Sequence, residues 1–317
     1  MGTLNPSAAN QMAAPCRNGF TLVELCAVLA TLAILAAVLL PALAGTKLNT
    51  QAFQCMNNER QMTLGWQMYA ADNNGLLAHN DYPYATAYFT QPSTIQNEMK
   101  NWVVGTMEQP ADANLARGQI ELKSLNSQLS PYVTNASVYR CPADNYYIDP
   151  IAHTLHARSY SMNSAVGTIG WTYYTSGSPP LASPVGQGWL GGSSWSASTA
   201  GPWLTYGKMS SFTKPGPANT WIFIEENPYS INDGDFAASA VATPGNTYLM
   251  DWPSGLHGAA NAISFADGHV IIHRWLDTRT YTPQGIVAPG KGSTTTSHQS
   301  PDDPDCFYLA PITSAPR

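Results

Sequence analysis

Residues 20–44 read FTLVELCAVLATLAILAAVLLPALA, and this stretch decides how the chain is organised. Its only charged side chain is Glu24. As an α-helix it would be about 37 Å long, which is enough to cross the hydrocarbon core of a bilayer. A carboxylate inside such a helix costs roughly 2.5–3.5 kcal/mol on insertion, so it usually has a partner. The stretch therefore predicts a helix that is buried in lipid or against other helices.

The composition of the whole chain excludes one broad class of function. The chain has 317 residues, of which 44% are hydrophobic and 11% are charged, whereas soluble domains carry about 25% charged residues. It holds 14 Lys and Arg against 20 Asp and Glu, and its formal charge is −6. Because sequence-independent binding of nucleic acid needs a cationic surface, we expect no nucleic-acid partner.

Three ordinary interpretations of the apolar stretch compete. A secretory signal peptide would be cleaved after residues 42–44 (ALA), but the stretch is too long and contains a carboxylate. A lipoprotein signal would end at Cys26, but Leu25 is not the small residue expected before a lipidated cysteine. A plain membrane anchor explains the apolar run but does not explain Glu24.

A more specific interpretation comes from the residues that open the stretch. Gly19-Phe20-Thr21-Leu22-Val23-Glu24 resembles the processing site of type IV prepilins and type II secretion pseudopilins. The resemblance implies that a prepilin peptidase removes residues 1–19 by cleaving between Gly19 and Phe20, and that Phe20 is then N-methylated. It also implies that Glu24 pairs with the terminal ammonium of a neighbouring subunit. Pro41 lacks the N–H of a helix hydrogen bond, so it kinks or locally opens the helix.

The helix is expected to continue beyond the apolar stretch. Apolar side chains recur at steps of mostly three and four and form one stripe, at Leu48, Ala52, Cys55, Met62, Trp66 and Tyr69. Residues 72–75 (DNNG) are a helix-stop signal, with Gly75 suited to a left-handed cap. We therefore predict one long helix, roughly 20–73, with residues 20–44 apolar all round and residues 45–74 amphipathic.

The remainder predicts an α+β head over residues 75–285, with the long helix packed on an antiparallel sheet. Residues 221–225 (WIFIE) are typical of a β-strand, and Asp-Gly between residues 262–265 and 270–275 indicates a hairpin. Residues 114–129 have helical spacing. Residues 166–208 are rich in Gly, Ser and Trp and are interpreted as a long loop insertion. Residues 286–317 are interpreted as a polar, partly disordered tail.

A second resemblance covers most of the head. His257, nine further residues and then Asp267-Gly268 match the "H-X9-DG" element that closes a family of prepilin-like proteins. Four supporting segments occur in the same order: residues 55–58 (CMNN), 139–144 (YRCPAD), 158–163 (RSYSMN) and 230–236 (SINDGDF). The resemblance implies a pseudopilin-like subunit.

His257 and Asp267 invite two interpretations. They could form a catalytic pair or supply two metal ligands. Alternatively, Asp267-Gly268 is only a hairpin turn and His257 bonds to a loop. The sequence contains neither a nucleophile elbow nor an HExxH motif, so we do not expect an enzyme.

Oxygen donors also cluster before this element. Glu225, Asp233 and Asp235 lie within eleven residues and are candidate calcium ligands, because hard cations prefer carboxylate oxygens. The run does not match an EF-hand loop, and Asn-Asp-Gly is equally typical of a solvated turn. The resemblance to type II pseudopilins, which carry calcium in a C-terminal loop, favours calcium.

The cysteines suggest a cross-link if the head faces an oxidising exterior. Cys55–Cys141 is the disulfide we expect, tying the long helix to the head, and unpaired buried thiols are the alternative. Cys306 would be left over.

Together these features predict a structural pilin or pseudopilin subunit, anchored once in the cytoplasmic membrane with its head outside. The expected partners are further copies, other pseudopilins, the prepilin peptidase, the inner-membrane assembly machinery and membrane lipid. One alternative is a glycan-binding adhesin that uses Trp189, Trp195 and Trp203 of the insertion. Another is a membrane-anchored hydrolase that uses His257.

Overall fold

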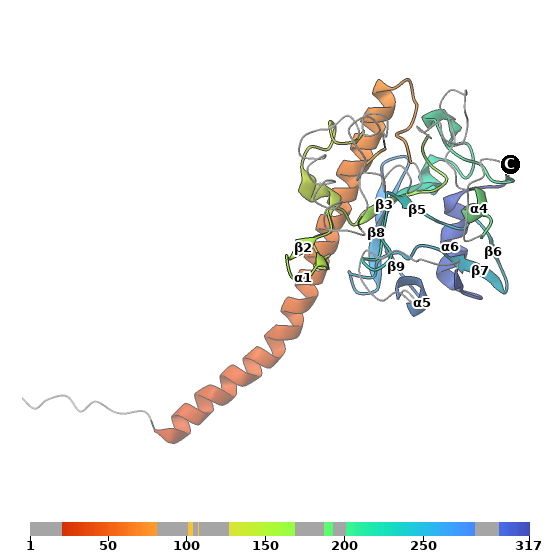
Figure 1. Ribbon diagram of the computed structural model, residues 1–317. Helices are drawn as coiled ribbons and strands as arrows, with labels where there is room; N and C mark the ends of the chain where they lie inside the picture. Colours follow the sequence, from red (N-terminus) through yellow and green to blue (C-terminus); the bar gives the residue numbers. More distant parts are fainter. Residues whose placement is uncertain are drawn as a thin grey trace, which may run out of the picture. The chain divides into compact units, whose positions relative to one another are not determined.

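A computed structural model describes residues 21–80, 101–103, 107, 127–168, 187–192, 201–282 and 298–317, with the backbone alone for residues 38–47, 187–188 and 298–299. The chain divides into two compact units, Met1–Lys47 and Leu48–Arg317. Helix α1 (Leu22–Asp72) contributes to both units, and the other helices and strands belong to the second. Figure 1 shows the chain and labels α1 and several of the other helices and strands.

The first part of α1 leaves its apolar side chains uncovered. Leu22 is 79% exposed and Ile34 is 66% exposed. Glu24 lies in the first turn and accepts hydrogen bonds from the backbone N–H and the hydroxyl of Thr21. Among the helices of the described residues, none is both long and apolar enough to cross a membrane.

The later part of α1 presents one buried stripe. Cys55, Met62, Trp66 and Ala70 are fully buried in the main core cluster. The helix ends at Asp72, and the Gly75 N–H then donates to the carbonyl oxygen of Ala70 at 2.8 Å. Gly75 has a φ of +79°, the left-handed conformation that its position in the DNNG signal predicts.

The centre of the second unit is a five-stranded sheet in the order β5-β3-β4-β8-β9. Its strands are β3 (Tyr160–Asn163), β4 (Trp221–Glu225), β5 (Asp235–Phe236), β8 (Ala260–Phe265) and β9 (Val270–Arg274). Strand β3 pairs with β5 in parallel, and the other neighbours are antiparallel. The predicted strand 221–225 and the predicted hairpin are therefore confirmed, and the fold is a mixed α+β fold.

Smaller elements surround this sheet. Strands β1 (Tyr147–Asp149) and β2 (Thr154–Leu155) pair with each other, and β6 (Ala242–Thr243), β7 (Asn246–Leu249) and β10 (His298–Gln299) form a three-stranded sheet. The short helices are η1 (Ala136–Tyr139), α4 (Gln187–Leu190), η3 (Met209–Ser211), η4 (Pro217–Asn219) and α5 (Thr278–Tyr281), and α6 (Pro304–Thr313) closes the chain.

The two faces of the five-stranded sheet are covered by different helices. One face contributes Phe223 to the core cluster that contains Met62 and Trp66 of α1. The other face contributes Ile224 to a cluster that contains Leu309 of α6. Strict alternation is broken in β4, where Ile222 and Phe223 enter one core and Trp221 and Ile224 the other, because the pairing with β8 is irregular between Trp221 and Ile224.

The end of the chain corrects one expectation. Residues 298–317 are not a disordered polar tail, because they form β10 and α6 and bury Cys306 and Leu309. Asp303 caps α6 by accepting a hydrogen bond from the Asp305 N–H, and Pro304 follows at the start of the helix. A few apolar residues at helical spacing are enough to dock this helix. The predicted helix at 114–129 lies largely outside the described residues.

Candidate functional site

Four segments that are distant in sequence bring a cluster of chemically reactive side chains together inside the second unit. Cys55 comes from α1, Cys141 from the loop after η1, Glu225 from the end of β4, and His257 from the loop before β8. The two cysteines and the glutamate are fully buried, and His257 is 9% exposed. One atom from each side chain lies within 4.8 Å of the other three.

The contacts inside this Cys55–Cys141–Glu225–His257 cluster are close. His257 Nε2 lies 3.3 Å from Cys141 Sγ and 3.3 Å from Glu225 Oε2. The thiol of Cys55 donates to the same glutamate oxygen at 3.4 Å. Glu225 Oε2 therefore contacts both Cys55 and His257, and His257 Nε2 contacts both Glu225 and Cys141.

The local fold holds each of these side chains in place. The backbone N–H of Cys141 donates to Ser159 Oγ at 3.1 Å, and Ala143 N–H donates to Cys141 Sγ at 3.3 Å. The hydroxyl of Tyr160 lies 3.2 Å from Cys55 Sγ. Tyr160 belongs to β3 and pairs with Glu225 of β4. The cluster is thus built on a helix and a sheet rather than on loops alone.

Burial and mutual contact shift the protonation of the cluster. Burial works to lower the pKa of His257, but hydrogen bonds with Cys141 and Glu225, and their charges, raise it to about 10. Burial raises the pKa of Cys55 well above its usual value, and the contacts with Cys141 and Glu225 raise it further. Burial likewise raises the pKa of Glu59, a fully buried neighbour that feels the charge of Glu225. A charged imidazolium therefore faces Glu225 at neutral pH.

Several polar atoms in and beside the cluster lack a hydrogen-bond partner among the described residues. They are Glu225 Oε1, His257 Nδ1 and both carboxyl oxygens of Glu59. Leaving such a buried group unsatisfied costs about 1–3 kcal/mol. The protein groups described here therefore do not complete the polar bonding of the cluster.

The geometry limits the chemistry that the cluster can perform. In a Cys–His–carboxylate relay, the cysteine and the carboxylate contact opposite nitrogens of the imidazole. Here Cys141 and Glu225 both contact Nε2 of His257. The arrangement therefore does not match that of a hydrolytic nucleophile, whereas two sulfurs, one imidazole and one carboxylate are a donor set that suits a metal ion.

The three candidate calcium ligands are not brought together. Glu225 joins the cysteines and His257, while Asp235 accepts a hydrogen bond from Asn80 Nδ2 at 3.2 Å. Asp233 accepts from the backbone N–H of Asp235 at 2.8 Å. Because β3 lies between β4 and β5, closeness in sequence does not become closeness in space.

The expected disulfide is corrected in part. Cys55 and Cys141 do meet, as the pairing required, but both are free thiols. Their sulfur atoms contact Glu225 and His257 rather than forming a bond with each other. Cys306 is also a free thiol and is buried beside Leu249 and Trp252.

The two ends of the H-X9-DG element have separate positions. Asp267 and Gly268 form the turn of the β8–β9 hairpin, and the hairpin interpretation is confirmed. Gly268 has a φ of +96°, and a Cβ there would lie 3.3 Å from Gln67 Nε2 of α1. Gln67 Nε2 in turn donates to the Ala266 carbonyl at 3.0 Å. His257 and Asp267 lie before and after β8, so they do not form a pair.

The proposed processing site is only partly visible. Gly19 and Phe20 lie outside the described residues, and Pro41 falls where the backbone of α1 alone is described. Glu24 is exposed at the start of α1.

The tryptophans proposed for glycan binding are packed where they are described. Trp189 is 6% exposed and contacts Ala237 and Met250, and Trp203 packs against the main core. Trp195 lies outside the described residues.

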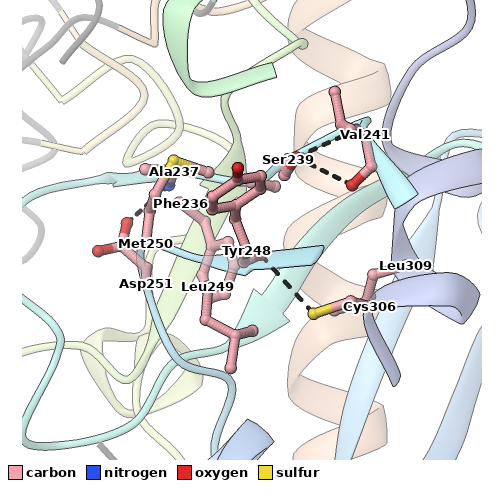
Figure 2. A pocket seen from close by; sticks show the side chains of 11 residues that line it. Phe236, Ala237, Ser239, Val241, Tyr248, Leu249, Met250, Asp251, Cys306 and Leu309 are labelled. Carbon is pink, nitrogen blue, oxygen red and sulfur yellow. Dashed lines mark hydrogen bonds between the residues drawn. The ribbon is translucent and has the colours of Figure 1, made fainter. Parts of the chain in front are cut away.

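Figure 2 shows a cavity lined by β5, β7 and α6, with Asp251 accepting from the Ala237 N–H and Cys306 donating to the Tyr248 carbonyl. The cavity measures about 20 Å³, which is room for one water molecule rather than a ligand.

No known family model, curated protein or solved structure matches this chain. The candidate site therefore stands on its geometry. The sequence pointed separately to all four of its residues, as a disulfide, a calcium ligand and a motif histidine, but it contained no spacing that joined them.

Proposed function

We propose that the chain is a structural pilin- or pseudopilin-like subunit that assembles through the first part of α1. The observation that carries the proposal is the uncovered apolar surface of that helix. Eight of its apolar side chains are at least 44% exposed: Leu22, Val23, Leu25, Val28, Leu29, Leu32, Ile34 and Leu35. A soluble monomer rarely leaves such a contiguous surface exposed to water, so another apolar phase or helix is needed to cover it.

Glu24 supports the same proposal. It is the one carboxylate in this apolar part of the helix, and among the described residues its bonds are local, to Thr21. After cleavage between Gly19 and Phe20, the new terminal ammonium of a neighbouring copy would offset its charge. In this proposal the processed helix rests in the cytoplasmic membrane before assembly and packs against other copies in a filament, with the head outside.

The later part of α1 also supports the proposal that the long helix packs on the head. This part buries Met62 and Trp66 in the core of the second unit. A single helix would then carry the assembly surface at one end and the head at the other. The prepilin peptidase, the inner-membrane assembly machinery and related pseudopilins would be its partners.

The mass of the intact protein extracted from membranes tests the processing. We expect a chain that begins at an N-methylated Phe20. A chain that begins at Met1 or at Gly45 would contradict the proposal.

A Glu24→Ala variant tests the assembly. It should still be cleaved, because the cleavage site is intact, but it should form few filaments. Thr31→Ala, which alters another exposed position of the same helix, is the matched control and should assemble normally. Normal filaments from the Glu24 variant would remove the proposed role of the carboxylate.

No observation favours a second function. Trp189 and Trp203 are packed against apolar neighbours rather than displayed for glycan stacking. The contacts of His257 do not form a relay for hydrolysis.

A further inference from the structure

We propose that Cys55, Cys141, Glu225 and His257 bind one structural zinc ion inside the head. The four residues all belong to the unit Leu48–Arg317, and the proposal does not depend on assembly through the N-terminal helix. It concerns how the head is held together.

The donor set selects the metal. Zinc is bound in proteins by cysteine sulfur, histidine nitrogen and carboxylate oxygen, and structural sites use four protein ligands in a tetrahedron. Calcium and magnesium prefer oxygen ligands alone, so two sulfurs and an imidazole disfavour them. Full burial of Cys55, Cys141 and Glu225 also fits a closed structural site, because a catalytic zinc keeps one position open to water or substrate.

The spacing of the donors matches a tetrahedron. Zinc–ligand bonds of about 2.0–2.3 Å place neighbouring ligand atoms about 3.3–3.8 Å apart at the tetrahedral angle. The three close contacts in the cluster measure 3.3 Å, 3.3 Å and 3.4 Å. All four donor atoms lie within 4.8 Å of one another, so small side-chain movements suffice to surround an ion.

The unpartnered oxygen of Glu225 is an independent observation. Glu225 is fully buried at the end of β4, and its Oε1 has no hydrogen-bond partner among the described residues. Oε2 of the same carboxylate is shared by the Cys55 thiol and by His257. A cation at this point would bind the carboxylate directly and remove the cost of burying it.

Groups around the cluster suit thiolate ligands. Ala143 N–H donates to Cys141 Sγ, and the Tyr160 hydroxyl lies within hydrogen-bond distance of Cys55 Sγ. Such contacts orient metal-bound sulfur and stabilise its charge. On zinc binding both thiols and the His257 imidazolium would each release one proton to solvent, so that His257 would bind through its unprotonated Nε2.

The proposed ion would join four parts of the fold. Cys55 anchors α1, Cys141 anchors the loop after η1, Glu225 anchors the central sheet, and His257 anchors the loop that leads into β8. The histidine of the H-X9-DG element would then be a zinc ligand, and its Asp-Gly end a turn that contacts Gln67 of the same helix.

Metal analysis of the purified full-length chain tests the proposal. We expect one zinc per chain by native mass spectrometry and elemental analysis. Replacement of zinc by Co²⁺ should give the intense visible bands of tetrahedral cobalt together with thiolate-to-cobalt absorption. These measurements use the unaltered protein, so they do not depend on whether a variant folds.

Variants identify the ligands. Cys55→Ser and His257→Gln should each lower zinc affinity more than about 100-fold, since altering even an outer-shell partner costs 10–100-fold. Cys306→Ser is the matched control, because Cys306 is a buried free thiol outside the cluster, and it should keep one zinc per chain.

Three outcomes would overturn the proposal: a Cys55–Cys141 disulfide in the isolated protein, two free thiols with no zinc after exposure to zinc, or unchanged zinc affinity in both ligand variants. None of these outcomes bears on cleavage at Gly19 or on assembly, so the two proposals can fail separately.

Discussion

Glu225 ends β4 and Glu226 follows it, yet the two glutamates lie in different buried clusters. Both carboxylate oxygens of Glu226 accept hydrogen bonds, from the hydroxyls of Ser161 and Ser230. The buried guanidinium of Arg158 also reduces the free-energy cost of burying a charged Glu226. Glu225 Oε1 has no hydrogen-bond partner in the described part of the chain, and Oε2 is shared by the Cys55 thiol and His257. The Glu226 cluster pairs its carboxylate with an arginine, which does not bind metal, whereas the Glu225 cluster combines its carboxylate with two thiols and a histidine, the donor set of a metal site.

The largest effect should come from removing metal. If the free zinc concentration exceeds the dissociation constant about 10,000-fold, zinc binding stabilises the folded chain by about 5 kcal/mol. For a domain of this size, that free energy corresponds to a shift on the order of 10 °C in melting temperature. A strong chelator should therefore lower the melting temperature of the wild type and of Glu226→Gln by that amount.

The same chelator should leave the melting temperature of Glu225→Gln unchanged, because that variant has already lost a ligand. Equal chelator sensitivity in the two glutamine variants, measured by scanning calorimetry, would erase the distinction between the clusters.

Arg158→Ala should have the next largest effect, a loss of about 3–5 kcal/mol in the free energy of unfolding. Arg158 is fully buried and donates to the Tyr160 carbonyl and to Ser161 Oγ. Its removal leaves Glu226 and Asp233 without their nearby cation. Urea unfolding of metal-loaded protein measures the change.

Arg279→Ala is the control for this substitution. Arg279 pairs with Asp277 where its side chain is 41% exposed, so its loss should cost no more than about 1 kcal/mol. Similar losses in the two arginine variants would show that the buried cluster is not held by its internal cation.

Gly268→Ala should cost about 1–2 kcal/mol without changing the zinc content. Its φ of +96° strains any residue with a Cβ, and that Cβ would press on Gln67 of α1. Gly245 has a similar positive φ of +72°, but a Cβ there would meet no atom within 4 Å. Gly245→Ala therefore measures the cost of backbone strain alone. If denaturation shows equal costs for both, the contact with Gln67 contributes nothing.

The smallest effect should be a change in the pH dependence of stability caused by His273, which is half buried beside Tyr308. Burial lowers its pKa, and the charge of Asp305 opposes this only in part. The folded state therefore favours neutral His273, and its contribution to stability is lost as pH falls below the ordinary value of about 6.5.

His273→Phe keeps a ring against Tyr308 and should make the fall in stability between pH 7 and pH 5 less steep. Unfolding curves measured across that range test this prediction. If stability falls with pH as steeply in the variant as in the wild type, His273 does not contribute to the pH dependence.

Local patterns predicted local structure well. The alternation and turn chemistry of residues 221–225 and 262–275 indicated β4 and the β8–β9 hairpin, because these elements depend on neighbouring residues. Helix α6 was missed because prolines and acids surround its short apolar run, and its stability comes from docking against Trp221 and Ile224.

The candidate site could not be predicted as a whole. Cys55, Cys141, Glu225 and His257 come from four elements, and only the pairing of β4 with its neighbours brings them together. Glu225 was grouped with Asp233 and Asp235 because they are close in sequence. The strand order β5-β3-β4 places another strand between them, which no local pattern reveals.

Two of the attachments of the head to α1 fix the length of helix between them. Cys55 is one of the four residues of the cluster, and Gln67 Nε2 donates a hydrogen bond to the carbonyl oxygen of Ala266. Inserting one residue between these points would rotate one attachment by about 100° and shift it by about 1.5 Å relative to the other. The number of residues between 55 and 67 is therefore fixed. This segment tolerates substitution on its exposed side but no insertion or deletion, whereas a surface loop can lengthen at little cost.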